Sequence, residues 1–208
     1  MSGRDNKTNA SNAAERFFRL YHSHCVAPNR DTLFSFLEAA HSLNDRLQSD
    51  EGLNFSDLPE FLALRCLRNF FHHHQELRHV VRAVPARDYP IVTELMILCL
   101  VPRDIVERAG NETRGRRKEE VWDACRSVFH WYGSVVNINP ALFNFVVSAY
   151  ERIKGANVAL ADEAFQQFQA IYFYEKAIGC PHRVEGRLAA HAGNIDQLLA
   201  NIMNTKGL

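Results

Sequence analysis

The stretch SDLPEFLALRCLRNFFHHHQELRHVVRAV, residues 56–84, decides the fold class that this sequence predicts. Ser56 is a suitable N-cap, and Pro59 is tolerated in the first turn of a helix. Apolar residues then recur at the spacing of a buried helical face, at Leu58, Phe61, Leu62, Leu67, Phe71, Leu77 and Val81. The spacing predicts one long helix that continues to about Val84.

Helical periodicity continues through most of the chain. Asp31 and Asp162 are predicted N-caps, and Asn139 followed by Pro140 is typical of a helix start. Further helices are predicted over residues 11–24, 31–47, 103–109, 119–131, 139–155, 162–178 and 194–203. Residues 91–100 read as a short buried helix, although an apolar run of this length does not exclude a strand.

These elements predict an all-α fold with little β structure. No Asn-Gly or Asp-Gly pair separates two alternating runs, so the usual sequence signal for a β-hairpin is missing. No stretch rich in Pro, Gly or Ser marks a domain boundary. We therefore expect a single-domain helical bundle over residues 11–204, with additional C-terminal helices packed on its side, and flexible tails at residues 1–10 and 205–208.

The composition is that of a globular protein with balanced charge. The 208 residues are 47% hydrophobic and 23% charged, which argues against a disordered or coiled-coil chain. The net charge is zero, so the chain does not bind nucleic acid through an overall positive field. Its 24 basic residues are 19 arginines and only 5 lysines. Arginine is well suited to phosphate contacts, so the position of these arginines matters.

The sequence predicts a cytoplasmic protein without a membrane span. Residues 1–10 lack the apolar stretch of a secretion signal. The most apolar run has only 11 residues and contains Glu94, whereas a membrane-spanning helix needs about 20 residues. The five cysteines are widely spaced and form no CxxC pair, and we expect Cys66, Cys99 and Cys125 to be reduced core residues.

The long predicted helix also carries residues suited to RNA cleavage. Three consecutive histidines, His72 to His74, follow Arg68 and Asn69. Residues four apart stack on a helix, so Arg68 aligns with His72 and Asn69 aligns with His73. A histidine can take the 2′-hydroxyl proton of RNA or protonate the leaving 5′-oxygen near neutral pH. An arginine can stabilise the charge on the phosphate, and an asparagine can orient the imidazole or the ribose.

The hexapeptide RNFFHH at residues 68–73 resembles the signature of HEPN ribonucleases. That signature is an arginine, a polar residue, three further residues and a histidine, on a helix of an all-α bundle. By this resemblance Arg68 is the arginine, Asn69 the polar residue and His73 the histidine, and these are the expected catalytic residues. Spacing varies within the family, so His74 also fits, and Arg65 with His72 is a looser match. The expected supporting residues are therefore Arg65, His72 and His74.

The resemblance implies an endoribonuclease that uses neither a metal nor a cofactor, because the 2′-hydroxyl of the RNA is the nucleophile. HEPN proteins commonly form homodimers in which two motif helices build a composite site. Many are toxins or defence components, and some are neutralised by an antitoxin. Other members have lost catalysis and bind only RNA, nucleotides or partner proteins. RNA, a second copy of the chain and an antitoxin are thus the expected partners.

A second basic segment follows the predicted helix at residues 103–109. Its cations can track an RNA backbone through phosphate contacts, although a solvated loop is the commoner explanation. They are Arg114, Arg116, Arg117 and Lys118. Glu119 and Glu120 follow directly and partly cancel this charge. The periodic spacing around Trp122 and Trp131 assigns both indole rings to packing.

Other interpretations of the motif remain open. Arg68 and Arg78 can lie on a solvated helix face and pair with acidic neighbours such as Glu76. The histidines can form a surface strip, or be hydrogen-bonded in the core. The chain would then be a non-catalytic helical binding or regulatory module, or an antitoxin subunit. We expect no metal site, because His74 and His79 are five apart and no HExxH motif occurs.

Overall fold

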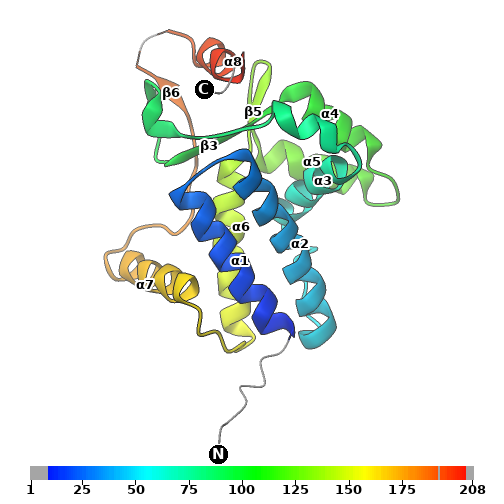
Figure 1. Cartoon of the computed structure of the whole chain (residues 1–208), viewed down its shortest axis with the longest axis vertical. Helices are drawn as coiled ribbons and strands as arrows, with labels where there is room; N and C mark the ends of the chain where they lie inside the picture. Colours follow the sequence, from blue (N-terminus) through cyan, green and yellow to red (C-terminus); the bar gives the residue numbers. More distant parts are fainter. Residues whose placement is uncertain (1–8, 192, 205–208) are drawn as a thin grey trace, which may run out of the picture.

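The computed structural model describes residues 9–191 and 193–204. The helices in these ranges are α1 (Asn9–Val26), α2 (Arg30–Glu51), α3 (Pro59–His73), α4 (Arg103–Glu112), α5 (Lys118–Val128), α6 (Asn139–Gly155), α7 (Glu163–Ala177) and α8 (Ile195–Asn204), with short 3-10 helices η1 (Gln75–Val80) and η2 (Ala86–Asp88). The strands are β1 (Arg82–Pro85), β2 (Ile91–Val92), β3 (Ile97–Pro102), β4 (His130–Tyr132), β5 (Val135–Asn137) and β6 (Ala189–Ala190). Figure 1 shows the sheet lying across one end of α1, α2 and α6.

The mainly helical character predicted from the sequence is confirmed, but the all-α prediction is wrong. Four strands form an antiparallel sheet in the order β1-β3-β5-β4. Cys99 of β3 lies opposite Ala83 of β1, and Val101 lies opposite Val136 of β5. A separate antiparallel pair joins β2 to β6 near the C-terminal end. The β structure is minor, as expected, but it divides the hydrophobic interior into two layers.

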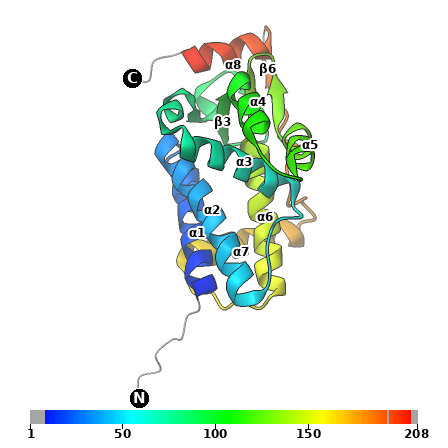
Figure 2. The same ribbon diagram turned by 90° about the vertical axis from the view of Figure 1, so that its right-hand side faces the viewer.

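The short helix predicted over residues 91–100 is wrong, because residues 97–102 form strand β3, which is buried on both faces. Ile97, Cys99 and Val101 belong to the large helical core. Leu98 and Leu100 alternate with them and pack into a second cluster together with residues of α8. A strand covered on both sides is continuously apolar and loses the alternation that identifies a strand. Figure 2 shows α8 at the end of the molecule, beyond the sheet.

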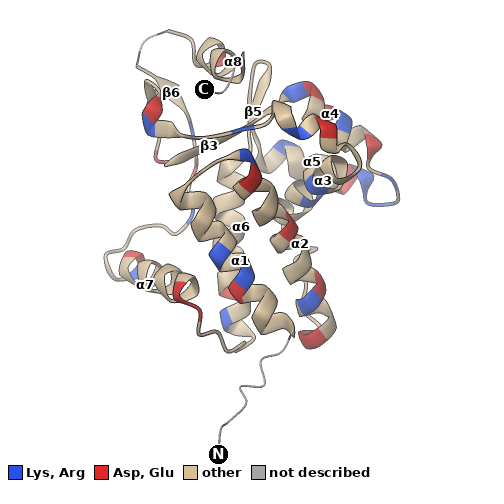
Figure 3. Cartoon of the chain, viewed as in Figure 1, with Lys and Arg blue, Asp and Glu red and all other residues tan. Residues whose placement is uncertain are grey.

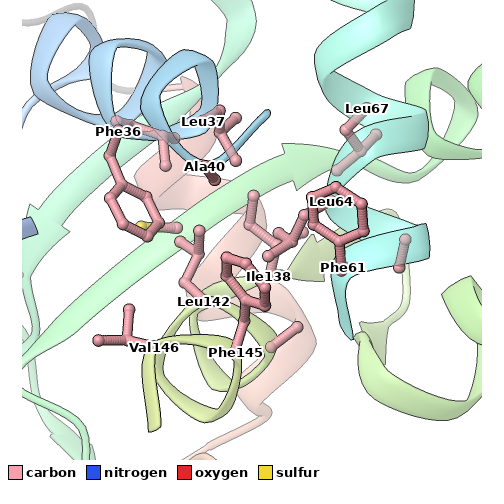
Figure 4. Packing of buried hydrophobic residues seen from close by; sticks show 14 of the residues in the cluster. Phe36, Leu37, Ala40, Phe61, Leu64, Leu67, Ile138, Leu142, Phe145 and Val146 are labelled. Atoms are coloured by element: carbon pink, nitrogen blue, oxygen red, sulfur yellow. The ribbon is translucent and has the colours of Figure 1, made fainter. Parts of the chain in front are cut away.

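Aromatic rings from four parts of the chain meet in the helical core, and Figure 4 shows two of them, Phe61 of α3 and Phe145 of α6. The ring of Phe145 on α6 lies 5.8 Å from Phe17 of α1, 5.5 Å from Phe61 of α3, and 5.3 Å from Phe55, measured between centroids. Each ring is at most 2% exposed. Burial of one such side chain contributes about 1.5–3 kcal/mol. These contacts fix α3 against α1 and α6, and so fix the helix that carries the motif.

The helix over residues 56–84 is shorter than its periodicity predicts. It begins at Pro59 rather than at Ser56, and it ends at His73. The chain then continues through η1 into β1, where residues 82–85 pair with β3. Strand pairing with a distant segment overrides the local helical pattern here. His72 and His73 therefore lie in the last turn of α3, and His74 is its C-cap.

The predicted tails were placed slightly too far into the chain at the N-terminal end. Asn9 and Ala10 belong to α1, and the side chain of Ala10 is fully buried. The N–H group of Ala10 donates a hydrogen bond to Asp50 Oδ2 at 2.8 Å. The remaining tail residues, 1–8 and 205–208, lie outside the described part of the chain.

Two further expectations concern the cysteines and the membrane. Cys66, Cys99 and Cys125 are buried free thiols, as predicted, whereas Cys25 and Cys180 are exposed. Within residues 9–191 and 193–204, no helix has the length and apolar character needed to cross a bilayer.

Candidate functional site

Many residues predicted for RNA chemistry line one cavity of about 1120 Å³, which we call the basic cavity. Helix α3 contributes Leu62, Arg65, Cys66, Asn69, Phe70 and His73. The end of α4, the loop that follows it and the start of α5 contribute Ala109, Asn111, Glu112, Thr113, Arg114, Arg116, Arg117, Lys118 and Val121. His41 of α2 completes the lining. Five of the lining residues are Arg or Lys and one is a carboxylate, so the cavity suits an anionic ligand.

One face of α3 presents Arg65, Asn69 and His73 to the basic cavity. These residues are four apart, so their side chains stack along the helix. The structure therefore brings Asn69 and His73 together, as the helical spacing predicted. The imidazole of His73 is exposed and makes no hydrogen bond to any residue in the described ranges. It is free to exchange a proton with a ligand in the cavity.

Arg68 faces α2 instead of the basic cavity. Its Nε and Nη2 atoms donate to Glu38 Oε2 at 2.9 and 2.5 Å. Its Nη1 atom donates to Asn69 Oδ1 at 3.2 Å. Arg68 is thus separated from the cavity lining, and its acidic partner is Glu38 of α2 rather than Glu76. The contact to Asn69 leaves Arg68 able to orient the amide that does line the cavity.

The two other histidines of the motif lie at the edge of the site. His72 is exposed, and its ring centroid is 5.6 Å from that of His73. His74 Nε2 lies 3.0 Å from Glu112 Oε2, and its ring centroid is 4.6 Å from that of Phe70. Neither ring lines the basic cavity. His74 joins the end of α3 to the end of α4 and holds the carboxylate of Glu112, which does line it.

The basic loop after α4 reaches the same cavity. Figure 3 shows Lys and Arg concentrated in this loop at the edge of the molecule. Arg117 donates to both carboxylate oxygens of Glu120, at 2.5 and 2.6 Å, and Lys118 Nζ donates to the carbonyl oxygen of Asn111 at 2.9 Å. Arg114 and Arg116 are exposed and make no hydrogen bond or ion pair to another residue of the described chain. Glu120 therefore neutralises part of the patch, and two cations stay available.

Arg65 makes no ion pair with another residue of the described ranges, although the charges of Asp45 and Glu120 act on it and raise its pKa. Its guanidinium carbon lies 5.5 Å from the centroid of the Phe61 ring. Burial lowers the pKa of the Arg65 guanidinium, and the positive charge of Arg117 lowers it further. Glu120, which pairs with Arg117, and Asp45 offset part of this repulsion between the two cations. An anion bound near Arg65 would add to this compensation.

His41, which lies outside the motif, is a second imidazole in the basic cavity. His41 Nδ1 lies 3.3 Å from Asp45 Oδ2, one turn along α2. This contact orients the ring and favours one tautomer when the ring is neutral. The His-Asp spacing of four is visible in the sequence. Nothing in the sequence places it beside residues 65–73, because the contact between α2 and α3 is tertiary.

The floor of the cavity contains a buried thiol that the sequence analysis assigned to the core. Cys66 Sγ lies 3.4 Å from Thr113 Oγ1. A hydrogen bond from the Cys125 thiol lowers the pKa of Cys66, while the same contact and burial raise the pKa of Cys125. Because Cys66 is only 7% exposed, a ligand in the cavity reaches its edge and not its full surface.

The comparisons with known proteins identify no family for this chain. No group of three or more His, Cys, Asp or Glu side chains with the arrangement of a metal site occurs in residues 9–191 and 193–204. Protein-family models, curated proteins and solved structures were compared with the chain, and none matches it. The resemblance to HEPN ribonucleases therefore rests on the motif of α3.

Proposed function

We propose that this chain is a HEPN-like endoribonuclease that cleaves RNA without a metal, through attack by the 2′-hydroxyl group. The observation that carries the proposal is the basic cavity. Two segments with chemistry suited to RNA, residues 65–73 and 114–118, are separated by about forty residues, yet both line it. A phosphodiester seated there meets cations, an amide and an imidazole together.

In this proposal His73 is the general acid or base. It removes the 2′-hydroxyl proton or protonates the leaving 5′-oxygen, and the products are a 2′,3′-cyclic phosphate and a 5′-hydroxyl. Asn69 orients the ribose or the imidazole. Arg65 and the loop cations bind the phosphate, because they line the cavity and Arg68 does not. Arg68 is a positioning residue that acts through its hydrogen bond to Asn69.

His41 is a second candidate for proton transfer within the same chain. Cleavage through a cyclic phosphate needs one group that accepts a proton and one that donates it. His41 and His73 both line the cavity, and Asp45 orients the ring of His41. A single chain can thus supply both groups, and a homodimer with a composite site would add a second set.

The remaining parts of the proposal follow from the resemblance. The expected partners are RNA, a second copy of the chain and, for a toxin or defence component, a neutralising antitoxin. The expected compartment is the cytoplasm. His72 and His74 support the site from its edge, where His74 holds Glu112.

A cleavage assay in EDTA tests the assignment of His73. We expect the purified chain to cut single-stranded RNA in EDTA, and His73→Ala to slow cleavage by about 100-fold or more, the usual contribution of a general acid or base. His22→Ala is the matched control, because His22 is an exposed histidine on α1 outside the basic cavity. Cleavage that requires Mg²⁺, or full activity of His73→Ala, would overturn the proposal.

One observation favours a second candidate, a module that binds RNA without cleaving it. The motif arginine, Arg68, is held by Glu38 and does not reach the cavity. Under this alternative the basic cavity binds a phosphodiester but leaves it intact. RNA binding with no cleavage by the wild-type chain, in EDTA or with Mg²⁺, would decide for this second function.

A further inference from the structure

A second hollow adjoins the basic cavity, and it contains both tryptophans of the chain. Its volume is about 550 Å³, and its lining is Arg103, Glu107, Asn111, Trp122, Arg126 and Trp131. The sequence pattern assigned both indole rings to packing, and each ring is half-buried. Each nevertheless presents a part of its surface to the hollow.

The ring of Trp122 is fixed between the backbone of α4 and an arginine. A Cβ atom at Gly110 would come within 2.5 Å of Trp122 Cε2, so the indole lies directly on the glycine. On α5, Arg126 Cζ lies 5.0 Å from the centroid of the same ring. The Arg126 side chain is 66% exposed. Its guanidinium therefore lies near the indole and remains accessible to a ligand.

Trp131 has a similar arrangement on β4. Its Nε1–H donates to the carbonyl oxygen of Cys125 at 3.3 Å, which sets the orientation of the ring. Arg103 Cζ lies 5.6 Å from the ring centroid. Arg103 is held in turn by Glu107 Oε1, 2.9 Å from its Nε. The hollow thus has two arginine–tryptophan pairs, of which Arg103 and Trp131 are each held by a hydrogen bond of their own.

Asn111 connects this hollow to the basic cavity, because it lines both. Lys118 Nζ donates to the backbone carbonyl of Asn111, so a phosphate-binding cation lies at the junction. The hollow carries two arginines, and each is paired with a carboxylate, Arg103 with Glu107 at 2.9 Å and Arg126 with Asp123 at 3.5 Å, so it has far less positive charge than the basic cavity. A strand held by its phosphates in the first site can continue past Asn111 into the second.

We propose that this second hollow is a nucleobase subsite for single-stranded RNA, in which an unpaired base stacks on the arginine–tryptophan surface. The proposal rests on the proposed function, since the basic cavity must bind the neighbouring phosphates. Bases stack on aromatic rings and on guanidinium planes, and only an unpaired base has its faces free. The substrate is therefore single-stranded, and duplex RNA does not occupy this subsite.

Tryptophan fluorescence tests the proposal directly, because the only two tryptophans in the sequence both line the hollow. The probe is a dye-labelled 2′-O-methyl RNA strand of about eight nucleotides, within the site sizes known for single-strand binding. Its blocked 2′-hydroxyls prevent cleavage during the titration. An abasic oligomer of equal length and charge is the control ligand. Dye anisotropy reports binding, and tryptophan emission reports stacking.

We expect both oligomers to bind, and only the strand with bases to quench tryptophan emission along its binding curve. Arg126→Gln should weaken binding of that strand by about fivefold or more and leave the affinity for the abasic oligomer nearly unchanged. Arg30→Gln, which changes an exposed arginine at the start of α2, should alter neither.

The outcomes separate this proposal from the one on which it rests. Binding of both oligomers without a change in tryptophan emission overturns the base subsite and leaves the endoribonuclease proposal intact. Equal losses for the two oligomers in Arg126→Gln also overturn it, because the arginine would then act on phosphate alone. If neither oligomer binds, both proposals are overturned.

Discussion

At the scale of single residues, Arg65 and Arg68 lie almost one helical turn apart and have different surroundings. Arg68 has 20% of its side chain exposed and is paired with Glu38. Arg65 lines the basic cavity, and burial together with Arg117 lowers its pKa. The motif alone assigns the phosphate to Arg68. The surroundings assign phosphate binding to Arg65. The two assignments predict different effects when each arginine is replaced.

Substitution of each arginine by glutamine separates these roles. We expect Arg65→Gln to lower RNA cleavage by about 10- to 100-fold with little loss of stability, because it removes a cation that faces the phosphate. We expect Arg68→Gln to lower the free energy of unfolding by about 1 kcal/mol, because Glu38 loses the closer of its two arginine partners and keeps only Arg78, 3.8 Å away. Cleavage rates and urea denaturation measure the two effects. A loss of cleavage in Arg68→Gln together with a loss of stability in Arg65→Gln would show that Arg68 binds the phosphate.

His24 gives a prediction about pH that does not depend on the proposed function. Its ring is 1% exposed and lies between Thr32 Oγ1 at 3.0 Å and Cys99 Sγ at 3.4 Å. Burial lowers the pKa of His24 from 6.5 to about 4. The folded chain therefore holds His24 neutral. The unfolded chain binds a proton at this ring between pH 6.5 and 4, so stability falls as the pH is lowered through this range.

We expect His24 to cost the fold about 2 kcal/mol at pH 5 relative to pH 7, from the size of its pKa shift. Urea denaturation at pH 5 and pH 7 gives the free energy of unfolding of the wild-type chain and of His24→Gln. The contribution of His24 is the difference between the losses that the two chains show at pH 5. The glutamine variant should show the smaller loss at pH 5. Parallel losses in the two chains would mean that His24 is protonated in the folded state.

At the scale of elements, local signals located the helices well, and tertiary contacts decided the rest. The helix predicted over residues 139–155 is α6, although its N-cap is Ile138 and the expected cap, Asn139, is its first residue. The Asp162 cap of α7 is confirmed, since its Oδ1 accepts from the Ala164 N–H at 3.0 Å. Such signals depend only on neighbouring residues, so a single sequence contains them.

The elements that were missed depend on distant segments. Strand β3 is covered on both faces, and its pairing with β1 ends the helical pattern after His73. The same limit applies to the candidate site. The spacing of Asn69 and His73 follows from helix geometry, but the contribution of His41 requires knowing that α2 lies beside α3. The Glu38 partner of Arg68 is tertiary for the same reason.

Two glycines test the packing of α4 against α5. Alanine normally stabilises a helix relative to glycine, by about 1 kcal/mol. At Gly110 an added Cβ atom meets the Trp122 ring, whereas at Gly155, the last residue of α6, nothing lies within 4 Å of it. We expect Gly110→Ala to destabilise the fold by about 1–3 kcal/mol and to change tryptophan emission. Gly155→Ala, the matched control, should be neutral or stabilising in thermal denaturation. Stabilisation by both changes would show that Gly110 is not in contact with the Trp122 ring.

At the scale of the whole molecule, a net charge of zero coexists with a local concentration of cations. The sequence has 24 basic and 24 acidic residues, and five of the basic ones line the basic cavity. If the proposed function holds, long-range attraction of RNA is weak and binding depends on direct phosphate contacts. A protein of this kind should show a modest dependence of affinity on salt.

The salt dependence of RNA binding measures how many phosphates these cations contact. We expect the slope of log affinity against log salt to fall by about 1.4 in magnitude when Arg114 and Arg116 are both changed to glutamine, because each single-strand phosphate contact contributes about 0.7. Changing the exposed Arg16 and Arg30 alters the net charge equally and should leave the slope unchanged. Equal effects of the two double variants would show that overall charge, and not the basic cavity, governs binding.

The identity of the cleaved ends tests the central claim most directly. If the 2′-hydroxyl of the RNA is the nucleophile, the wild-type chain in EDTA leaves a 2′,3′-cyclic phosphate and a 5′-hydroxyl, and a single 2′-deoxy nucleotide at the cut position blocks cleavage there. Mass spectrometry of the fragments distinguishes these ends. A 5′-phosphate with a 3′-hydroxyl, or cleavage at the 2′-deoxy position, would contradict the mechanism that we assign to the basic cavity.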